Sequence, residues 1–256
     1  MKKIDGWLHP DFVPVARSLR SLVDGYEGGA AVCVYHRGEC VVDLWGGVRN
    51  AEGDAWTQYT MAPSFSTTKG IASTLVHIMV DRGKLDYDTR VAEYWPDFGQ
   101  AGKEEITLRH VLAHQSGLYH IRQMIDHADR MLDWDYMIHA IERCEPIHPP
   151  GERTGYHGLT YGYLVGEIVQ RVTGHRFSEL VATELAEPLA LDGLYVGAPD
   201  EVHHLAADLM WPRAADWLRR LPQGALPEWL GRLAASGAEG ARRVIGLAGL
   251  ELDLDS

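Results

Sequence analysis

The segment Met61-Ala-Pro-Ser-Phe-Ser66-Thr-Thr-Lys69-Gly-Ile-Ala-Ser-Thr-Leu-Val-His-Ile-Met-Val80 is the most informative part of this 256-residue chain. Pro63 interrupts regular structure, and from Ile71 onward apolar residues recur at helical spacing. The run ends at Asp81-Arg-Gly83, where a glycine suits the C-terminal cap of a helix. We therefore expect a helix over this segment, with Ser66 at its start.

Ser66 and Lys69 form an S-x-x-K pattern, which places both side chains on one face of a helix. Serine is a poor nucleophile until a base takes its proton, and an adjacent amine in a suitable environment can be that base. Backbone N–H groups at the helix start can stabilise an oxyanion. The spacing alone also fits a solvent-exposed lysine on a helix. The flanking apolar residues Phe65 and Ile71 favour a catalytic site instead, because a solvated helix turn would not need apolar residues around it.

The segments around this helix predict a mixture of strands and helices. The apolar runs 30–35 and 39–45, joined by a His36-Arg-Gly38 turn, predict a β-hairpin that follows a helix over about 13–23. Further helices are predicted over 107–117, 133–144, 160–172 and 177–189. The predicted fold class is therefore α/β (α+β), with an antiparallel sheet flanked by helices.

Composition excludes several classes of protein. The chain is 46% hydrophobic, which supplies a globular core, and its formal charge of -12 disfavours nucleic acid and acidic membranes as partners. Three cysteines do not suggest a disulfide framework, and no apolar run is long enough for a signal-peptide core or a membrane span. We expect a cytoplasmic protein with a small-molecule substrate, of undetermined oligomeric state.

The character of the chain changes after Trp211-Pro212. Residues 213–256 are rich in Ala, Leu, Arg and Gly, and their six arginines balance six acids. We therefore divide the chain into a domain over 1–212 and a tail over 213–256, to which the sequence assigns no structure.

Several passages in a fixed order carry a resemblance to a known family. The nucleophile segment is followed by the passage Ile106-Thr-Leu-Arg-His-Val-Leu-Ala-His114-Gln-Ser116-Gly-Leu118, and then by Pro149-Pro-Gly151-Glu-Arg-Thr-Gly-Tyr156-His-Gly-Leu-Thr-Tyr161. Together they resemble the serine β-lactamase and penicillin-binding protein superfamily. Within it they are most similar to the class C β-lactamase-like esterases, or family VIII carboxylesterases.

The resemblance implies a β-lactamase/transpeptidase-like fold and a set of roles. Ser66 would be the acyl-accepting nucleophile, Lys69 its base or proton relay, and Tyr156 the group that takes or returns the serine proton. Phe65, His157 and Gly158 would contact substrate, although a packing role fits His157 equally well. The family's chemistry needs neither a metal nor an organic cofactor.

Two departures from the family pattern bear on activity. The amide-holding asparagine of the second motif is absent, because Tyr156 is followed by His157-Gly158 and the only asparagine is Asn50. The third family motif, expected near the C-terminus, is also missing. The tripeptide Arg153-Thr154-Gly155 is similar to that motif in composition, but it directly precedes Tyr156 on the same loop and cannot form the opposite side of the site. We therefore expect the C-terminal strands of the fold to be missing, as in a truncated reading frame.

These observations favour a serine hydrolase that cleaves short-chain carboxylic esters through an acyl-enzyme on Ser66. One alternative is a D-alanyl peptidase or weak β-lactamase. Another is a catalytically inactive truncated remnant, or a binding module. His110 and His114 have the i, i+4 spacing of metal ligands, but Val111 stands where a zinc-protease helix carries glutamate, so we assign no metal site.

Overall fold

The computed structural model describes residues 2–210. The described residues divide into two compact units, an N-terminal unit of residues 2–62 with 205–210 and a helical unit of Pro63–His204. The described part of the predicted domain 1–212 thus contains two units. The predicted tail over 213–256 lies outside the described residues.

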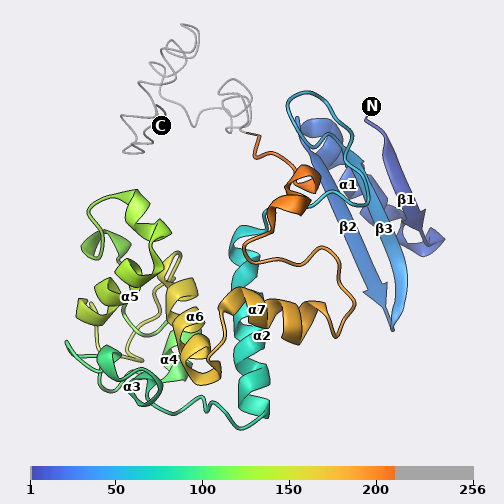
Figure 1. Cartoon of the computed structure of the whole chain (residues 1–256). Helices are drawn as coiled ribbons and strands as arrows, with labels where there is room; N and C mark the ends of the chain where they lie inside the picture. The colour runs from blue at the N-terminus through green and yellow to red at the C-terminus, as the bar shows by residue number, and fades with distance from the viewer. Residues whose placement is uncertain (1, 211–256) are drawn as a thin grey trace, which may run out of the picture. The chain divides into compact units, whose positions relative to one another are not determined.

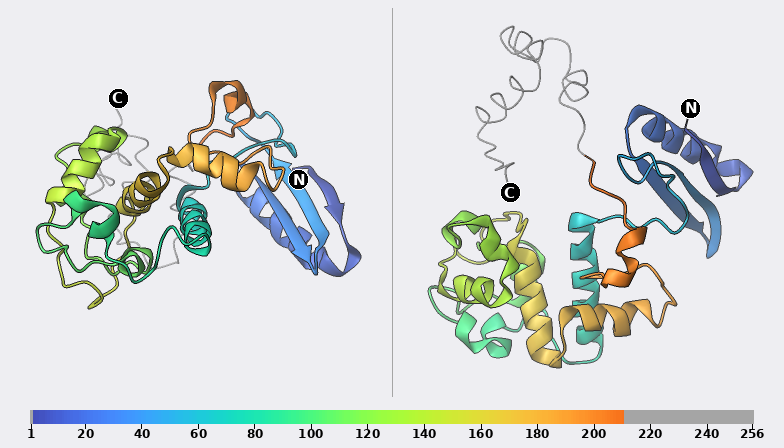
Figure 2. Two further views of the ribbon diagram at one scale, coloured as in Figure 1. Left: turned by 60° about the horizontal axis from the view of Figure 1, so that its bottom comes forward. Right: turned by 45° about the horizontal axis from the view of Figure 1, so that its top comes forward.

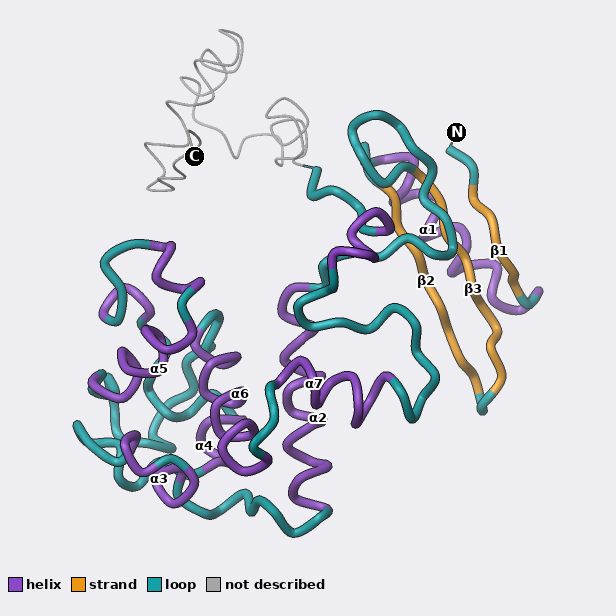
Figure 3. Tube along the Cα trace, viewed as in Figure 1, coloured by secondary structure: helices purple, strands orange, loops and turns teal. Residues whose placement is uncertain are grey.

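The N-terminal unit is built on a three-stranded antiparallel sheet in the order β1-β3-β2 (Figure 3). Its strands are β1 (Ile4–Leu8), β2 (Gly29–His36) and β3 (Glu39–Gly47). The β2–β3 hairpin confirms the sequence prediction, and its two-residue turn has positive φ at Arg37 (52°) and Gly38 (85°), as tight hairpin turns require.

Strand β1 was not predicted, because its sequence IDGWL lacks a clear alternation of apolar and polar residues. Gly6, at its centre, has φ 116°, and a Cβ there would lie 2.0 Å from the carbonyl oxygen of Asp43 on β3. Only glycine allows this close approach of the two backbones. The strand therefore depends on a tertiary contact rather than on local preference.

Helix α1 (Val13–Gly25) packs on one face of this sheet (Figure 1). Leu19 and Val23 of the helix are buried together with Val42 and Leu44 of β3. An antiparallel sheet with helices confirms the predicted fold class.

The helical unit is arranged around two adjacent helices, α2 and α6, which Figure 2 shows in teal and yellow. Its helices are α2 (Thr68–Asp81), α3 (Val91–Tyr94), α4 (Leu108–Leu112), α5 (Trp134–Arg143), α6 (Thr160–Thr173) and α7 (Phe177–Val181). Leu75 and Val76 of α2 share one buried cluster with Leu164 and Ile168 of α6. This packing fixes α2, and with it the segment that carries Ser66.

Helix ends follow the local sequence signals. The Thr107 hydroxyl accepts the His110 N–H at 3.3 Å at the start of α4, and Asp133 accepts the Tyr136 N–H at 3.0 Å at the start of α5. Gly174 ends α6 with φ 75°. The predicted helix over 177–189 differs in detail, since α7 ends at Val181 and continues as a π-helical turn over Ala182–Ala186.

One buried charged group helps to join loops of the helical unit. The Lys103 side chain is fully buried, and its Nζ donates to the carbonyls of Glu142 at 2.8 Å and Cys144 at 2.7 Å. The Glu142 carboxylate accepts the indole N–H of Trp95 at 2.7 Å. We call Lys103, Glu142, Cys144 and Trp95 the lysine cluster.

Candidate active site

The candidate nucleophile lies just before helix α2. Phe65–Thr67 forms a single 3-10 turn that runs into α2 at Thr68, so the prediction that Ser66 stands at a helix start is confirmed with this local difference. Phe65 has φ 46°, a region that bulky residues rarely enter. Such strained positions cluster at functional sites, and here the strained residue directly precedes an exposed serine.

Ser66 and Lys69 are brought together by the first turn of this segment. The Lys69 Nζ lies 3.2 Å from the Ser66 hydroxyl oxygen. The same ammonium donates to the Gly158 carbonyl at 2.7 Å, a contact between positions 89 residues apart. The Gly158 carbonyl therefore orients the lysine next to the serine.

Tyr156 completes the group from the loop that precedes α6. Its ring centroid lies 4.9 Å from the Lys69 Nζ, and its side chain is 59% exposed. Hydrogen bonds to Ser66, and then to Lys69, hold the pKa of Tyr156 below its ordinary value of 10.0. The phenol is thus biased toward the ionised form that can accept a proton from serine.

The loop around Tyr156 is held by its neighbours on both sides. The Gly155 N–H donates to the His114 carbonyl at 2.9 Å. A Cβ at Gly155 would lie 1.9 Å from the Tyr119 ring, so the loop approaches that ring as closely as only glycine permits. The tripeptide Arg153-Thr154-Gly155, which is similar in composition to the third family motif, therefore belongs to the loop that carries Tyr156, as its place in the sequence indicates.

His157 lies inside the protein rather than at the surface of the site. It is 0% exposed; its Nδ1 bonds to the Gly155 carbonyl at 2.7 Å, and its Nε2 to the Ser116 hydroxyl at 2.6 Å. Burial lowers the pKa of His157 from 6.5 to about 4, so the ring is neutral at pH 7. The structure therefore favours the packing alternative for His157 over the predicted contact with substrate.

The other two predicted substrate contacts, Gly158 and Phe65, have different surroundings in the structure. Gly158 directs its carbonyl to Lys69, which makes it a partner of the lysine. The Phe65 side chain is 69% exposed next to Ser66, and its contact with substrate stays a prediction.

Taken together, the arrangement provides the parts of an acyl-transfer site. A serine hydroxyl lies beside a lysine ammonium and a tyrosine with a lowered pKa, and all three are exposed or half-buried. Such a hydroxyl can lose its proton to a neighbouring base as it attacks a carbonyl carbon. The predicted trio of Ser66, Lys69 and Tyr156 is therefore assembled by the fold, and its catalytic role stays a prediction.

Sequence analysis missed the roles of two residues in the passage after α4. Ser116 is fully buried against His157, and His114 contacts the tyrosine loop through both its backbone and its ring. The only available signal was their place in the passage that resembles the family, which does not tell what either side chain contacts.

The remaining candidates have local structural roles. The His110 ring accepts the Thr107 N–H at 3.2 Å in the α4 cap. Within residues 2–210, no group of three or more His, Cys, Asp or Glu side chains is arranged to hold a metal ion. Asn50 bonds to Asp54 in a loop of the N-terminal unit.

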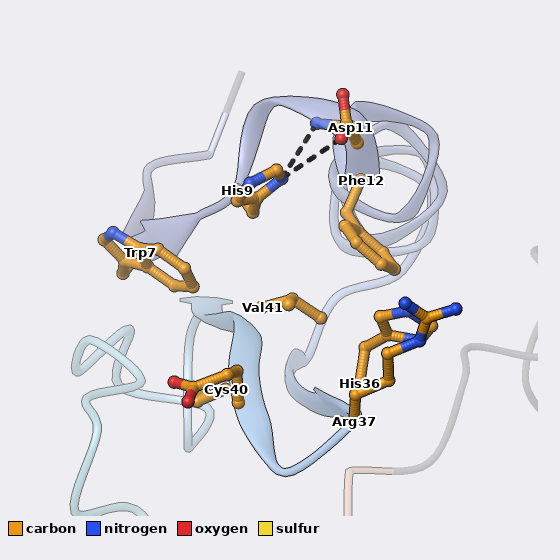
Figure 4. Close-up of a pocket in the computed structure, with 9 residues that line it drawn as sticks. Trp7, His9, Asp11, Phe12, His36, Arg37, Cys40 and Val41 are labelled. Carbon is orange, nitrogen blue, oxygen red and sulfur yellow. Dashed lines mark hydrogen bonds and ion pairs between the residues drawn. The ribbon is translucent and has the colours of Figure 1, made fainter.

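A hollow in the N-terminal unit is lined by residues that include Trp7, His9, Phe12 and His36 (Figure 4). The His9 ring accepts the Asp11 N–H at 3.3 Å there. This hollow contains neither a serine nor a lysine, so it offers none of the groups found at the candidate site.

Two further observations concern the described part of the chain. Within residues 2–210 no strand follows β3, and the place near the C-terminus where the third family motif was expected lies outside the described residues. None of the helices in that range is both long and apolar enough to cross a bilayer.

Comparison with known proteins identifies the family. The Beta-lactamase family model matches residues 15–251, and the chain belongs to this family. The group of serine, lysine and tyrosine at the candidate site is thus found on a member of the family that the sequence resembles.

Individual relatives agree with this assignment. The chain is 38% identical over 200 residues to "Esterase/beta-lactamase LipL" of Mycobacterium tuberculosis, in a match that covers 77% of this chain and 46% of that protein. Among solved structures it is similar to a penicillin-binding protein homologue from Caulobacter crescentus, with 39% identity, TM-score 0.76, and coverage of 83% of this chain and 57% of that one. A family VIII carboxylesterase structure has 36% identity, TM-score 0.76, and coverage of 84% and 59%. The chain spans about half the length of the curated relatives it matches.

Proposed function

We propose that this protein is a serine hydrolase that cleaves short-chain carboxylic esters through an acyl-enzyme on Ser66. The observation that carries the proposal is the placement of the Lys69 Nζ 3.2 Å from the Ser66 hydroxyl oxygen and 4.9 Å from the centroid of the Tyr156 ring. Its membership in the Beta-lactamase family supports the same reaction class.

The reaction would proceed in two steps. In the first, the Ser66 hydroxyl attacks the ester carbonyl while its proton passes to the Tyr156 oxygen, and that proton then leaves with the departing alcohol. In the second, water attacks the acyl-serine ester, gives a proton to the same base, and releases the carboxylic acid with Ser66 restored. Lys69 stabilises the ionised phenol throughout by its positive charge, and the Ser66 N–H is the expected oxyanion donor.

The preference for esters over lactams rests on the residue two positions after Tyr156. This residue is Gly158, which has no side-chain amide to hold the amide of a lactam or peptide substrate. Its carbonyl is engaged by Lys69. An ester substrate has no amide group, so it does not need a side-chain amide to hold it. The names of two relatives, an esterase/beta-lactamase and a family VIII carboxylesterase, support this substrate class.

The test is hydrolysis of p-nitrophenyl acetate and butyrate by the full chain and by Ser66→Ala. We expect turnover by the native chain and a loss of at least roughly 1,000-fold in the variant, because the nucleophile is removed. Ser64→Ala is the matched control, since the exposed Ser64 side chain makes no capping hydrogen bond, and it should retain activity.

Two further measurements sharpen this test. The kcat/KM of the native chain should rise with pH as Tyr156 ionises, through a pKa below 10.0, and Tyr156→Phe should lack this limb. Equal rates for the native chain and Ser66→Ala would reject the enzyme in favour of an inactive remnant or binding module. Nitrocefin turnover that matches ester turnover would instead favour a β-lactamase or D-alanyl peptidase.

A further inference from the structure

His114 occupies an unusual position directly after helix α4. Its φ is 59°, in the left-handed region, where His, Asn and Gly occur more readily than other residues. Its half-buried ring lies among three other rings, with centroids 5.0 Å from Tyr156, 5.0 Å from Tyr161 and 5.3 Å from His157. The backbone conformation thus directs this imidazole toward the tyrosine loop.

The backbone and the ring of His114 hold the loop on both sides of Tyr156. The His114 carbonyl accepts the Gly155 N–H at 2.9 Å, one residue before the tyrosine. The His114 Nδ1 accepts the His157 N–H at 3.1 Å, one residue after it. Tyr156 is therefore the residue between two hydrogen bonds to a single anchor.

The partners of the two histidines assign their tautomers. The Leu118 N–H points at the His157 Nε2 at 3.3 Å, so the proton of that ring is on Nδ1, which donates to the Gly155 carbonyl at 2.7 Å. The His114 Nδ1 accepts a backbone N–H, so its own proton is on Nε2. A proton added to the His114 Nδ1 would remove the acceptor and release the bond to His157.

The same segment also places the lysine. The Gly158 N–H donates to the Tyr156 carbonyl at 2.9 Å, and the Gly158 carbonyl accepts the Lys69 Nζ at 2.7 Å. A shift of the backbone at His157 would therefore move both the tyrosine and the acceptor that orients the lysine.

We infer that His114 is a positioning residue of the candidate active site, which holds Tyr156 and the Gly158 carbonyl in register with Ser66 through the acceptor at its Nδ1. The inference rests on the proposed function for its catalytic consequence, and its structural part is measurable without activity. The positioning atom is the Nδ1 lone pair; the rest of the ring fills space against Tyr156 and Tyr161.

Two substitutions separate the acceptor from the ring. His114→Asn keeps an acceptor, because the amide oxygen stands near the place of Nδ1, and asparagine tolerates the left-handed backbone. His114→Gly tolerates that backbone equally well but removes the acceptor. We expect His114→Gly to lower kcat on p-nitrophenyl butyrate by roughly 10- to 100-fold with little change in KM, and His114→Asn to recover most of that loss.

Amide hydrogen exchange of the full chain gives the readout that does not need activity. The His157 N–H should be protected in the native protein and in His114→Asn, and should exchange at least roughly tenfold faster in His114→Gly. His77→Asn is the matched control, because the His77 ring bonds to Tyr87 at 2.8 Å, away from the tyrosine loop, and it should change neither measurement.

The possible outcomes are distinct. Equal loss of kcat and of protection in His114→Asn and His114→Gly would overturn the inference, because ring packing would then be the only role. Native protection in His114→Gly would overturn it as well. Should the native chain match Ser66→Ala in the ester assay, the proposed function fails, and the exchange experiment still decides whether His114 holds the loop.

The pH profile tests the same atom. The charged and titratable groups that face His114 are Lys69 on α2, Tyr156 and His157 on the loop, and Tyr161 on α6. The alkaline limb assigned to Tyr156 should shift toward the ordinary tyrosine value in His114→Gly, since the phenol loses its place beside Ser66 and Lys69. An unchanged limb would mean that Tyr156 keeps its position without the acceptor.

Discussion

The helical unit contains two polar clusters that each connect chain segments distant in sequence. One does so through a lysine ammonium and the other through histidine rings. In the lysine cluster, the Lys103 ammonium donates to two backbone carbonyls. In what we call the histidine cluster, Ser116, His157 and His114 are linked through neutral imidazole rings. Both clusters join segments distant in sequence, but only the histidine cluster requires each ring nitrogen to be in one protonation state.

This difference matters because of what each cluster supports. An ammonium has three donors and no acceptor, so it satisfies carbonyls whatever its rotation. An imidazole offers one donor and one acceptor in fixed directions, which makes the geometry around it more specific. The more specific cluster lies beside Tyr156, and the less specific one ties a loop to the end of α5. The precise placement of groups is thus concentrated where the proposed chemistry needs it.

The largest expected effect is on the lysine cluster. Lys103→Ala leaves two buried carbonyls without their donor and opens a cavity, so we expect a loss of about 3–5 kcal/mol in the free energy of unfolding. Lys84→Ala, at an exposed lysine, is the control and should stay within about 0.5 kcal/mol. Urea unfolding measures both, and an equal effect at the two lysines would contradict the role given to Lys103.

A smaller effect is expected from acid acting on the histidine cluster. The folded-state pKa of His157 is about 4 and its ordinary value is 6.5, so between these values the unfolded chain binds more protons. Its contribution is complete above pH 6.5 and is lost as the pH falls toward 4; it amounts to at most about 3 kcal/mol.

The non-titrating variant His157→Asn isolates this contribution. Urea unfolding at pH 7 and near pH 4 should give a difference between native and variant stability that shrinks at the lower pH. A difference that is the same at both values would show that His157 does not titrate in this window. Other histidines contribute equally to both proteins and cancel.

The smallest effect is expected at Ser116. Ser116→Ala removes the hydroxyl that lies 2.6 Å from the His157 Nε2 but leaves the Leu118 N–H in place, so we expect a loss of about 1 kcal/mol. Ser73→Ala is the matched control, because the Ser73 hydroxyl donates to the Gly70 carbonyl within its own helix, and it should be nearly neutral. If Ser116→Ala lost more free energy of unfolding than Lys103→Ala, the histidine cluster would contribute more to stability than the lysine cluster, contrary to the order expected here.

Sequence analysis predicted the elements whose signals are local. The hairpin of β2 and β3, the helix that follows Ser66, and the starts of the helices near residues 107, 133 and 160 were visible in spacing and residue type. Strand β1 was missed, because a short segment with a central glycine becomes a strand only when β3 lies beside it. His157 was assigned to substrate as one of two alternatives, because burial is not visible in a Tyr-His-Gly sequence.

The sequence by itself determined that Ser66 and Lys69 would be neighbours, since residues three apart meet on one helical turn wherever the helix lies. It also determined the family, through motifs in a fixed order. Tertiary structure alone decided that Tyr156 and the Gly158 carbonyl would meet that pair, since they come from a loop in which Gly158 lies 89 residues beyond the lysine. It also decided that His157 would be buried and neutral, because hydrogen-bond partners and the loss of solvent depend on chain segments that only folding brings together.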